Sequence, residues 1–118
     1  MNGDKYIYVF KFDKGWNVPK FTIEKVKVKE TLKQYRCIED GKAPFCYSKQ
    51  VDKSNVDNKA IKSYSDIYYY SSDSNIEVFR NKVIELLESE IEKHKAKILE
   101  LQDYQEIVNR TINEQYNV

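Results

Sequence analysis

Tyrosine, arginine and asparagine side chains gather where the last predicted strand meets a predicted helix. The segment 68–75 reads YYYSSDSN, and Arg80 and Asn81 follow about one helical turn further on. Tyr69 and Tyr70 supply rigid apolar rings with polar tips, and the free N–H groups of a helix N-terminus favour a phosphate or carboxylate. This junction is therefore a predicted site for a nucleotide-type ligand, or else an ordinary capped turn.

Arginine is scarce in the chain, with three residues against 17 lysines. Its planar guanidinium suits phosphate recognition. Arg36 falls in a predicted strand and Arg110 near the end of the predicted helix. In an oligomer these two arginines and Arg80 can converge from different chains, so all three are candidate ligand-binding residues.

Lysines at a spacing of two form a second candidate surface. Lys25, Lys27 and Lys29 share one face of a predicted strand, with Lys33 and Arg36 close behind. Such a basic ribbon can contact phosphates of a nucleic acid. The same lysines also suit an exposed sheet face that resists edge-to-edge aggregation.

No catalytic, metal or cofactor signature is present, so we expect no enzyme, no metal and no cofactor. The chain lacks a glycine-rich phosphate loop and any zinc-protease motif. The single histidine, His94, has no cysteine or carboxylate at metal-ligand spacing. Cys37 and Cys46 flank a predicted turn, where a disulfide is conceivable, but we expect two free thiols in a reducing cytosol.

The composition describes one small folded domain. The 118 residues are 41% hydrophobic and 33% charged, with a formal net charge of +1. No stretch approaches the ~20 apolar residues of a membrane span, and no signal-peptide core opens the chain, so we expect a cytoplasmic protein without membrane contact. Residues 1–72 carry 14 basic and 9 acidic residues, and residues 73–118 carry 6 and 10, giving +5 and −4.

The first part, 1–72, is predicted to form an antiparallel meander of about five strands. Alternating or β-rich runs predict these strands, and residues 52–65 read as a polar loop with one short helical turn. The alternation changes phase near Glu24 and Lys25, which predicts a bulge or bend. The predicted strands cover 6–12, 21–31, 32–38, 45–51 and 67–70.

The second part, 73–118, is predicted to be helical. Residues 75–116 contain no glycine or proline, and Ser72, Asp73 or Ser74 can cap the helix, with Ser74 and Glu77 at capping-box spacing. Phe79 and Val83 are expected to dock the helix on the sheet. A helix hairpin broken near Asp103 is the alternative to one continuous helix.

Apolar residues recur every seven positions along this helix. Isoleucine fills one seam, interrupted by Gln105, and leucine or valine fills the other, interrupted by His94. This pattern is typical of a two-stranded parallel coiled coil, and polar seam residues set register at a cost in stability. We therefore expect a homo-oligomer formed through the helix. The seam residues are Ile84, Leu87, Ile91, Ile98, Leu101, Val108 and Ile112.

The layout resembles small accessory proteins encoded by phages of low-GC bacteria, and the α+β plan is similar to the Thoeris anti-defence sponge family. The resemblance rests on VKVKET (26–31), LKQYR (32–36), DIYYYSSDSN (66–75) and IEVFRNKVIELLE (76–88). It implies a non-enzymatic protein in an infected bacterium that sequesters a cyclic ADP-ribose-type immune signal between protomers. No site residue is carried over from the family.

Three functions therefore follow as hypotheses. The first is sequestration of a nucleotide-type signal by Arg36, Tyr69, Tyr70, Arg80, Asn81 and Arg110. The second is inhibition of a host defence enzyme by direct protein binding, in the manner of anti-CRISPR proteins. The third, nucleic-acid binding through the lysine ribbon, is weakened by the near-zero net charge and the acidic helix.

Overall fold

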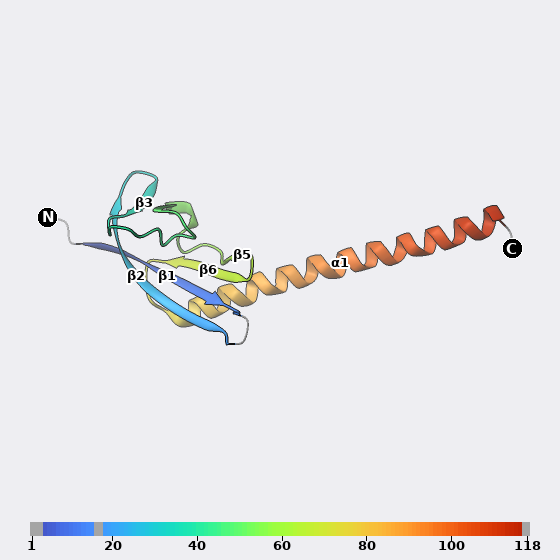
Figure 1. The fold of residues 1–118 in the computed structure, drawn as a ribbon, viewed down its shortest axis with the longest axis horizontal. Helices are drawn as coiled ribbons and strands as arrows, with labels where there is room; N and C mark the ends of the chain where they lie inside the picture. Colours follow the sequence, from blue (N-terminus) through green and yellow to red (C-terminus); the bar gives the residue numbers. More distant parts are fainter. Residues whose placement is uncertain (1–3, 16–17, 117–118) are drawn as a thin grey trace. The chain divides into compact units, whose positions relative to one another are not determined.

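A computed structural model describes residues 4–15 and 18–116, and it confirms the α+β class. An antiparallel sheet is followed by a single long helix, α1 (Figure 1). The sheet has six strands where about five were predicted. They are β1 (Lys5–Asp13), β2 (Lys20–Glu30), β3 (Gln34–Cys37), β4 (Gln50–Asp52), β5 (Ile61–Ser63) and β6 (Asp66–Ser71).

The strand order is β4-β3-β2-β1-β6-β5. The first four strands form the predicted meander, whereas β6 returns to pair with β1. This non-consecutive pairing leaves β4 and β5, with three residues each, at the two edges. The segment predicted as a loop therefore contains strand β5, together with the short 3-10 helix η1 (Lys53–Asn55).

Each face of the sheet carries its own hydrophobic core. In β1, Ile7 and Val9 point to one face, where they join Val26 and Val28 of β2. Phe10 points to the opposite face and packs with Tyr69 and Phe79. This two-sided burial explains the change in alternation along β2. Phe21, near its start, packs on the face that holds Phe10, whereas Val26 and Val28 pack on the face that holds Ile7 and Val9.

The bulge predicted near Glu24 and Lys25 is wrong. Pairing between β1 and β2 runs without interruption from Lys5 opposite Val28 to Asp13 opposite Lys20. Sequence alternation alone could not separate a bulge from a change in which face needs apolar residues.

The connections between strands cover the face that holds Ile7 and Val9. Phe45, from the segment between β3 and β4, is buried there with its ring edge against the Tyr70 ring at 5.5 Å. Val56 follows η1 and forms an isolated bridge with Tyr70. Because these connections supply apolar side chains, this face needs no helix.

The first turns of the helix α1 (Ile76–Tyr116) supply the opposite core. The Phe79 ring stacks 5.1 Å from Phe10 and 5.4 Å from Phe21, and Val83 packs against the same cluster. The prediction that Phe79 and Val83 dock the helix is therefore confirmed.

The strand predicted over 45–51 is mostly a tight turn. Phe45 and Ser48 exchange backbone hydrogen bonds of 3.0 and 3.1 Å across Cys46 and Tyr47. Both central residues have positive φ, 51° and 69°, as in the two-residue turns that usually hold Asn-Gly. Only residues 50–52 continue as strand β4, and both cysteines are free.

The helix α1 is continuous over 41 residues, so the predicted alternative of a break near Asp103 is wrong. Its cap is also different from the predicted Ser72, Asp73 or Ser74. The Asn75 side chain accepts hydrogen bonds from the backbone N–H groups of Glu77 and Val78, at 3.0 and 3.4 Å. The chain divides into two compact units, 1–86 and 87–118, and each is described by itself.

Candidate functional site

A cleft of about 970 Å³ lies beside the N-terminal end of β1. Its volume is in the range of pockets that hold small molecules. We call it the lysine cleft, because four lysines are among its lining residues. They are Asp4, Lys5, Lys27, Val28, Lys29, Glu30, Thr31, Leu32, Ile38 and Lys53.

Unequal strand lengths create the lysine cleft. Strand β1 begins at Lys5, opposite Val28, whereas β2 continues to Glu30, which pairs with Tyr35 of β3. Among the described residues, the last part of β2 thus has a strand on one side only. The open side becomes a wall of the cleft.

Glu30 gathers two of the four lysines. Its carboxylate accepts hydrogen bonds from Lys5, at 3.0 Å, and from Lys53. Both ammonium groups lie over the Tyr35 ring, 5.6 and 5.5 Å from its centre, within the distance of a cation–π contact. The hydrogen bonds from Lys53 and Lys5 hold the pKa of Glu30 below its usual value, and the bond to Glu30 raises the pKa of Lys5.

The other two lysines differ from each other in their partners. The Lys27 ammonium lies 3.3 Å from the Asp4 carboxylate, whereas Lys29 has no ion pair within the described residues. Arg36 lies directly across from Lys29 in β3, is exposed, and likewise has no ion pair there. Four lysines and two carboxylates give the lining a formal charge of +2, with Lys29 and Arg36 adjacent.

An apolar part completes the cleft. Leu32, in the turn between β2 and β3, is 89% exposed, and Ile38 is about half exposed. The Thr31 hydroxyl donates to the Gln34 carbonyl and accepts from the Gln34 N–H, both at 3.1 Å, and so fixes this turn. The cleft can therefore offer cations to one end of a ligand and aliphatic carbon to the other.

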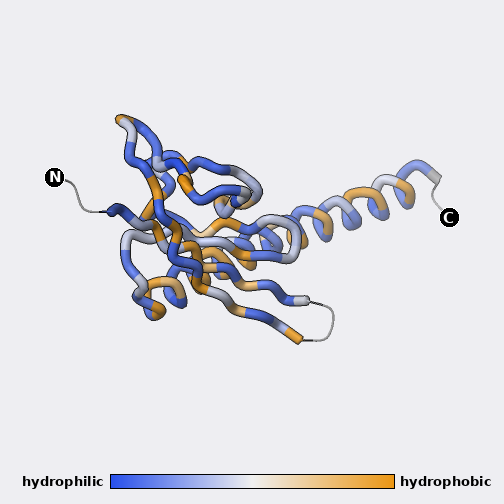
Figure 2. Tube along the Cα trace, turned by 60° about the vertical axis from the view of Figure 1, so that its left-hand side comes forward, coloured by the Kyte–Doolittle hydropathy of each residue, from blue (hydrophilic) through white to orange (hydrophobic). Residues whose placement is uncertain are grey.

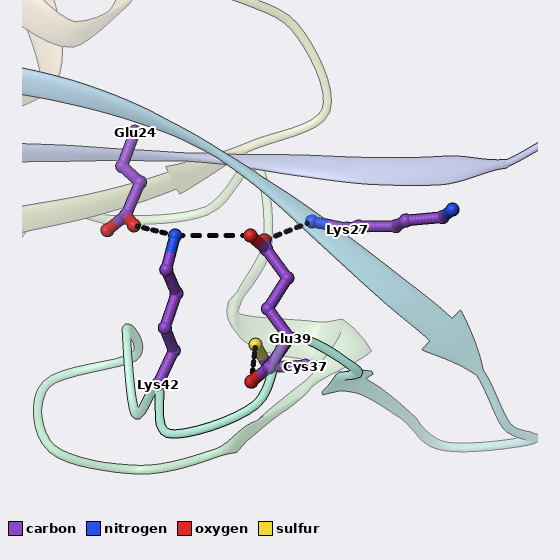
Figure 3. Close-up of polar contacts among 5 residues, drawn as sticks. All are labelled: Glu24, Lys27, Cys37, Glu39 and Lys42. Atoms are coloured by element: carbon purple, nitrogen blue, oxygen red, sulfur yellow. Dashed lines mark hydrogen bonds and ion pairs between the residues drawn. The ribbon is translucent and has the colours of Figure 1, made fainter.

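A polar network attaches the segment after β3 to β2 and so positions Ile38 (Figure 3). The Glu39 carboxylate accepts the backbone N–H of Lys27 at 3.0 Å and the Lys42 ammonium at 3.1 Å, and Lys42 also donates to Glu24 at 3.2 Å. Figure 3 shows the Lys27 side chain extending away from this network. The backbone amide of Lys27 thus serves the network while its ammonium remains in the cleft lining.

Two of the predicted ligand-binding residues lie in the cores. Tyr69 is 1% exposed and packs with Phe10 and Phe79, and Tyr70 is 4% exposed on the opposite face, against Phe45. Burial raises the pKa of both phenols. Because neighbouring strand residues point to opposite faces, the two rings do not form one surface, and neither is accessible to a ligand in this structure.

The remaining predicted residues are exposed and lie on separate elements. Arg80 and Asn81 belong to α1, where Arg80 pairs with Glu77 at 3.5 Å, whereas Arg36 belongs to β3. Arg110 is exposed in the unit 87–118. None of the six predicted residues lines the lysine cleft, and Arg36 is the one placed beside it.

The predicted phosphate position at the helix N-terminus also has internal partners. Asn75 already accepts two of the first N–H groups of α1, and the Asp57 side chain accepts both the backbone N–H and the hydroxyl of Ser72. This arrangement is that of a capped turn, which was the alternative interpretation of the junction.

The predicted lysine ribbon lies on β2, which lines the lysine cleft. Lys25, Lys27 and Lys29 lie on one face, as their spacing indicated, and the Lys25 ammonium lies 4.3 Å from the centre of the Tyr6 ring. Lys5, Glu30 and Lys53 were not identified from the sequence as candidate site residues. They come from β1, β2 and the start of η1, and no local pattern connects them.

No group of three or more metal-ligating side chains occurs within residues 4–15 and 18–116, and no helix in these ranges is long and apolar enough to cross a membrane. Comparison of the chain with protein-family models, curated proteins and solved structures gives no match. The similarity to the Thoeris anti-defence sponge family therefore stays a prediction.

Proposed function

We propose that the protein is a non-catalytic binding protein that captures a phosphate-bearing, nucleotide-type small molecule in the lysine cleft. The observation that carries this proposal is Lys29, a cleft lysine without an ion pair in the described chain, directly across from the exposed Arg36. Two adjacent cations without internal partners attract an anion, and a phosphate is the anion that arginine and lysine bind best together.

The rest of the cleft suits the remainder of such a ligand. Leu32 and Ile38 offer apolar surface to a base or sugar face, while Thr31 adds a polar backbone and side chain at the turn. Sequestration of a nucleotide-type signal in the cytoplasm of a bacterial host needs binding alone. It thus agrees with the anti-defence role that the resemblance implies.

Isothermal titration calorimetry with ADP-ribose tests the proposal. The wild-type protein is expected to bind, and Lys29→Gln is expected to weaken binding about fivefold, since one ion pair near 4 Å in water is worth ~1 kcal/mol. Lys59→Gln is the matched control, because Lys59 is also an exposed lysine but does not line the cleft. No binding to the wild type, or equal losses in both variants, would refute the site.

We further propose that the protein assembles as a parallel homodimer through α1. The seven apolar seam residues are 38% to 54% exposed. Figure 2 shows hydrophobic positions recurring along the helix. In a parallel pair, Glu90 of one helix faces Lys95 of the other, which is the position of attractive interhelical pairs in coiled coils. A coiled coil pairs helices whose apolar seams have the same spacing, and a second copy of this chain provides that spacing.

Sedimentation equilibrium over a range of protein concentrations tests the assembly. A mass of twice 14.1 kDa is expected. A monomer at all concentrations up to 100-fold above the assay minimum would contradict the dimer, and a stable trimer or tetramer would contradict its two-stranded form.

A protein partner is a second candidate, favoured by two exposed tyrosines. Tyr47 and Tyr64 are 82% and 95% exposed, and both have positive φ, 69° and 56°, which non-glycine residues adopt at a cost of ~1–2 kcal/mol. Exposed tyrosines on turns are typical of protein-binding surfaces. Capture of one stoichiometric host protein, lost in the Tyr47→Ser, Tyr64→Ser double variant, would favour this function over ligand capture.

A further inference from the structure

Glu30 already occupies an anion position inside the lysine cleft. One carboxylate oxygen bonds Lys5 and the other bonds Lys53, and the Tyr35 ring lies beneath both ammonium groups. A carboxylate between two lysines over an aromatic ring occupies the position that an acidic group of a ligand would otherwise take. The protein thus fills this part of the cleft with its own side chain.

We propose that Glu30 limits the charge of the ligand, so that the lysine cleft selects nucleotides with a total charge of about −2, such as AMP or ADP-ribose, and disfavours nucleoside triphosphates and nucleic-acid strands. This inference rests on the proposed function and names the class of ligand. It concerns a residue that lines the cleft and whose side chain is about two-fifths exposed.

The charges of the lining set this preference. Lys27 is neutralised by Asp4, and Lys5 with Lys53 shares the single charge of Glu30, so the net +2 is divided between this trio and Lys29. A phosphate monoester carries a charge of about −1.5 to −2 at neutral pH, which the lining balances together with the adjacent Arg36. Ligand charge beyond this meets the carboxylates of Glu30 and Asp4, because the other three lining lysines already have ion pairs.

Glu30→Gln is expected to change the preference in a measurable way. A unit charge about 7 Å from a ligand charge in water, screened by ~0.1 M salt with a Debye length of about 10 Å, alters the binding of each ligand charge by a factor of about 1.7. Removing the Glu30 charge should then tighten AMP, with about two charges, by a factor of about 3, and ATP, with about four, by a factor of about 8. The ratio of the two dissociation constants should shift about threefold toward ATP.

Calorimetric titrations of AMP and ATP, in magnesium-free buffer at one ionic strength, measure this ratio. Glu24→Gln is the matched control, since Glu24 is also a β2 carboxylate bonded to a lysine, Lys42, and does not line the cleft. Circular dichroism verifies the fold of both variants. The expected result is that the wild type and Glu24→Gln bind ATP no more tightly than AMP, whereas Glu30→Gln prefers ATP.

The outcomes separate this inference from the proposed function. If the wild type binds AMP but Glu30→Gln keeps the wild-type ratio, charge selection by Glu30 is wrong and the binding site stands. A wild type that binds ATP tenfold tighter than AMP also overturns the selection. If the wild type binds neither nucleotide nor ADP-ribose, the proposed function fails, and the selection fails with it.

Discussion

Replacing Ile98 by lysine should dissociate the proposed dimer. Ile98 lies on the isoleucine seam and is about half exposed in the single chain, so roughly half of its side chain remains to be buried by a partner helix. Full burial of an isoleucine is worth ~1.5–3 kcal/mol, which leaves about 1 kcal/mol for each chain and about 2 kcal/mol for the pair. Two lysines facing each other in the seam add repulsion.

The expected loss is therefore ~2–3 kcal/mol, which corresponds to a factor of roughly 30 to 150 in the dimer dissociation constant. Leu99→Lys supplies the control, because Leu99 is the next residue, is even more exposed, and lies off both seams. Sedimentation equilibrium of the wild type and the two variants measures the three constants. Equal weakening by both lysines, or weakening by Leu99→Lys alone, would refute the assignment of the seam.

Three other substitutions or conditions have defined outcomes. Phe79→Ala removes the ring that stacks on Phe10 and should lower the free energy of unfolding by ~3–5 kcal/mol in urea titrations monitored by circular dichroism; a loss below 1 kcal/mol would show that this ring does not hold the core. Asn75→Ala removes the helix cap and should cost ~1 kcal/mol in the same titration, whereas Asn75→Asp should retain most of the stability. The Lys27 amide and the Lys42 ammonium hold the pKa of Glu39 below its usual value, so its contribution to stability is present at neutral pH and is lost as the pH falls below about 4.5; the stability difference between wild type and Glu39→Gln should shrink over that interval, and a constant difference would contradict the network.

The longer elements could be predicted from the sequence because their signals are local. Alternation identified β1 and β2, a run of β-favouring residues identified β6, and the heptads identified α1. Strands β4 and β5 hold three residues each, too few for a period of two to be recognised. The pairing of β6 with β1 connects residues far apart in the chain and leaves no mark on either segment alone.

The candidate site was harder to predict for the same reason. The three consecutive tyrosines Tyr68, Tyr69 and Tyr70 were interpreted as part of a ligand-binding surface. They are buried, because a strand that is covered on both faces needs a continuous apolar run. Whether both faces are covered depends on Phe79 from one side and Phe45 from the other, and no local pattern contains either contact. The pairing of Lys5 and Lys53 through Glu30 likewise requires the folded sheet.

The two outermost strands of the sheet hold three residues each, so they offer little unpaired backbone to a neighbouring molecule. Amyloid-like growth needs a long flat edge on which a second strand can form a continuous ladder, and the charged Asp52 and Lys62 on these short edges oppose it further. Crowded solutions of the protein should therefore resist conversion to fibres, although nearly every strand is rich in residues that favour β structure. The fold thus keeps its β-prone sequence away from intermolecular strand pairing.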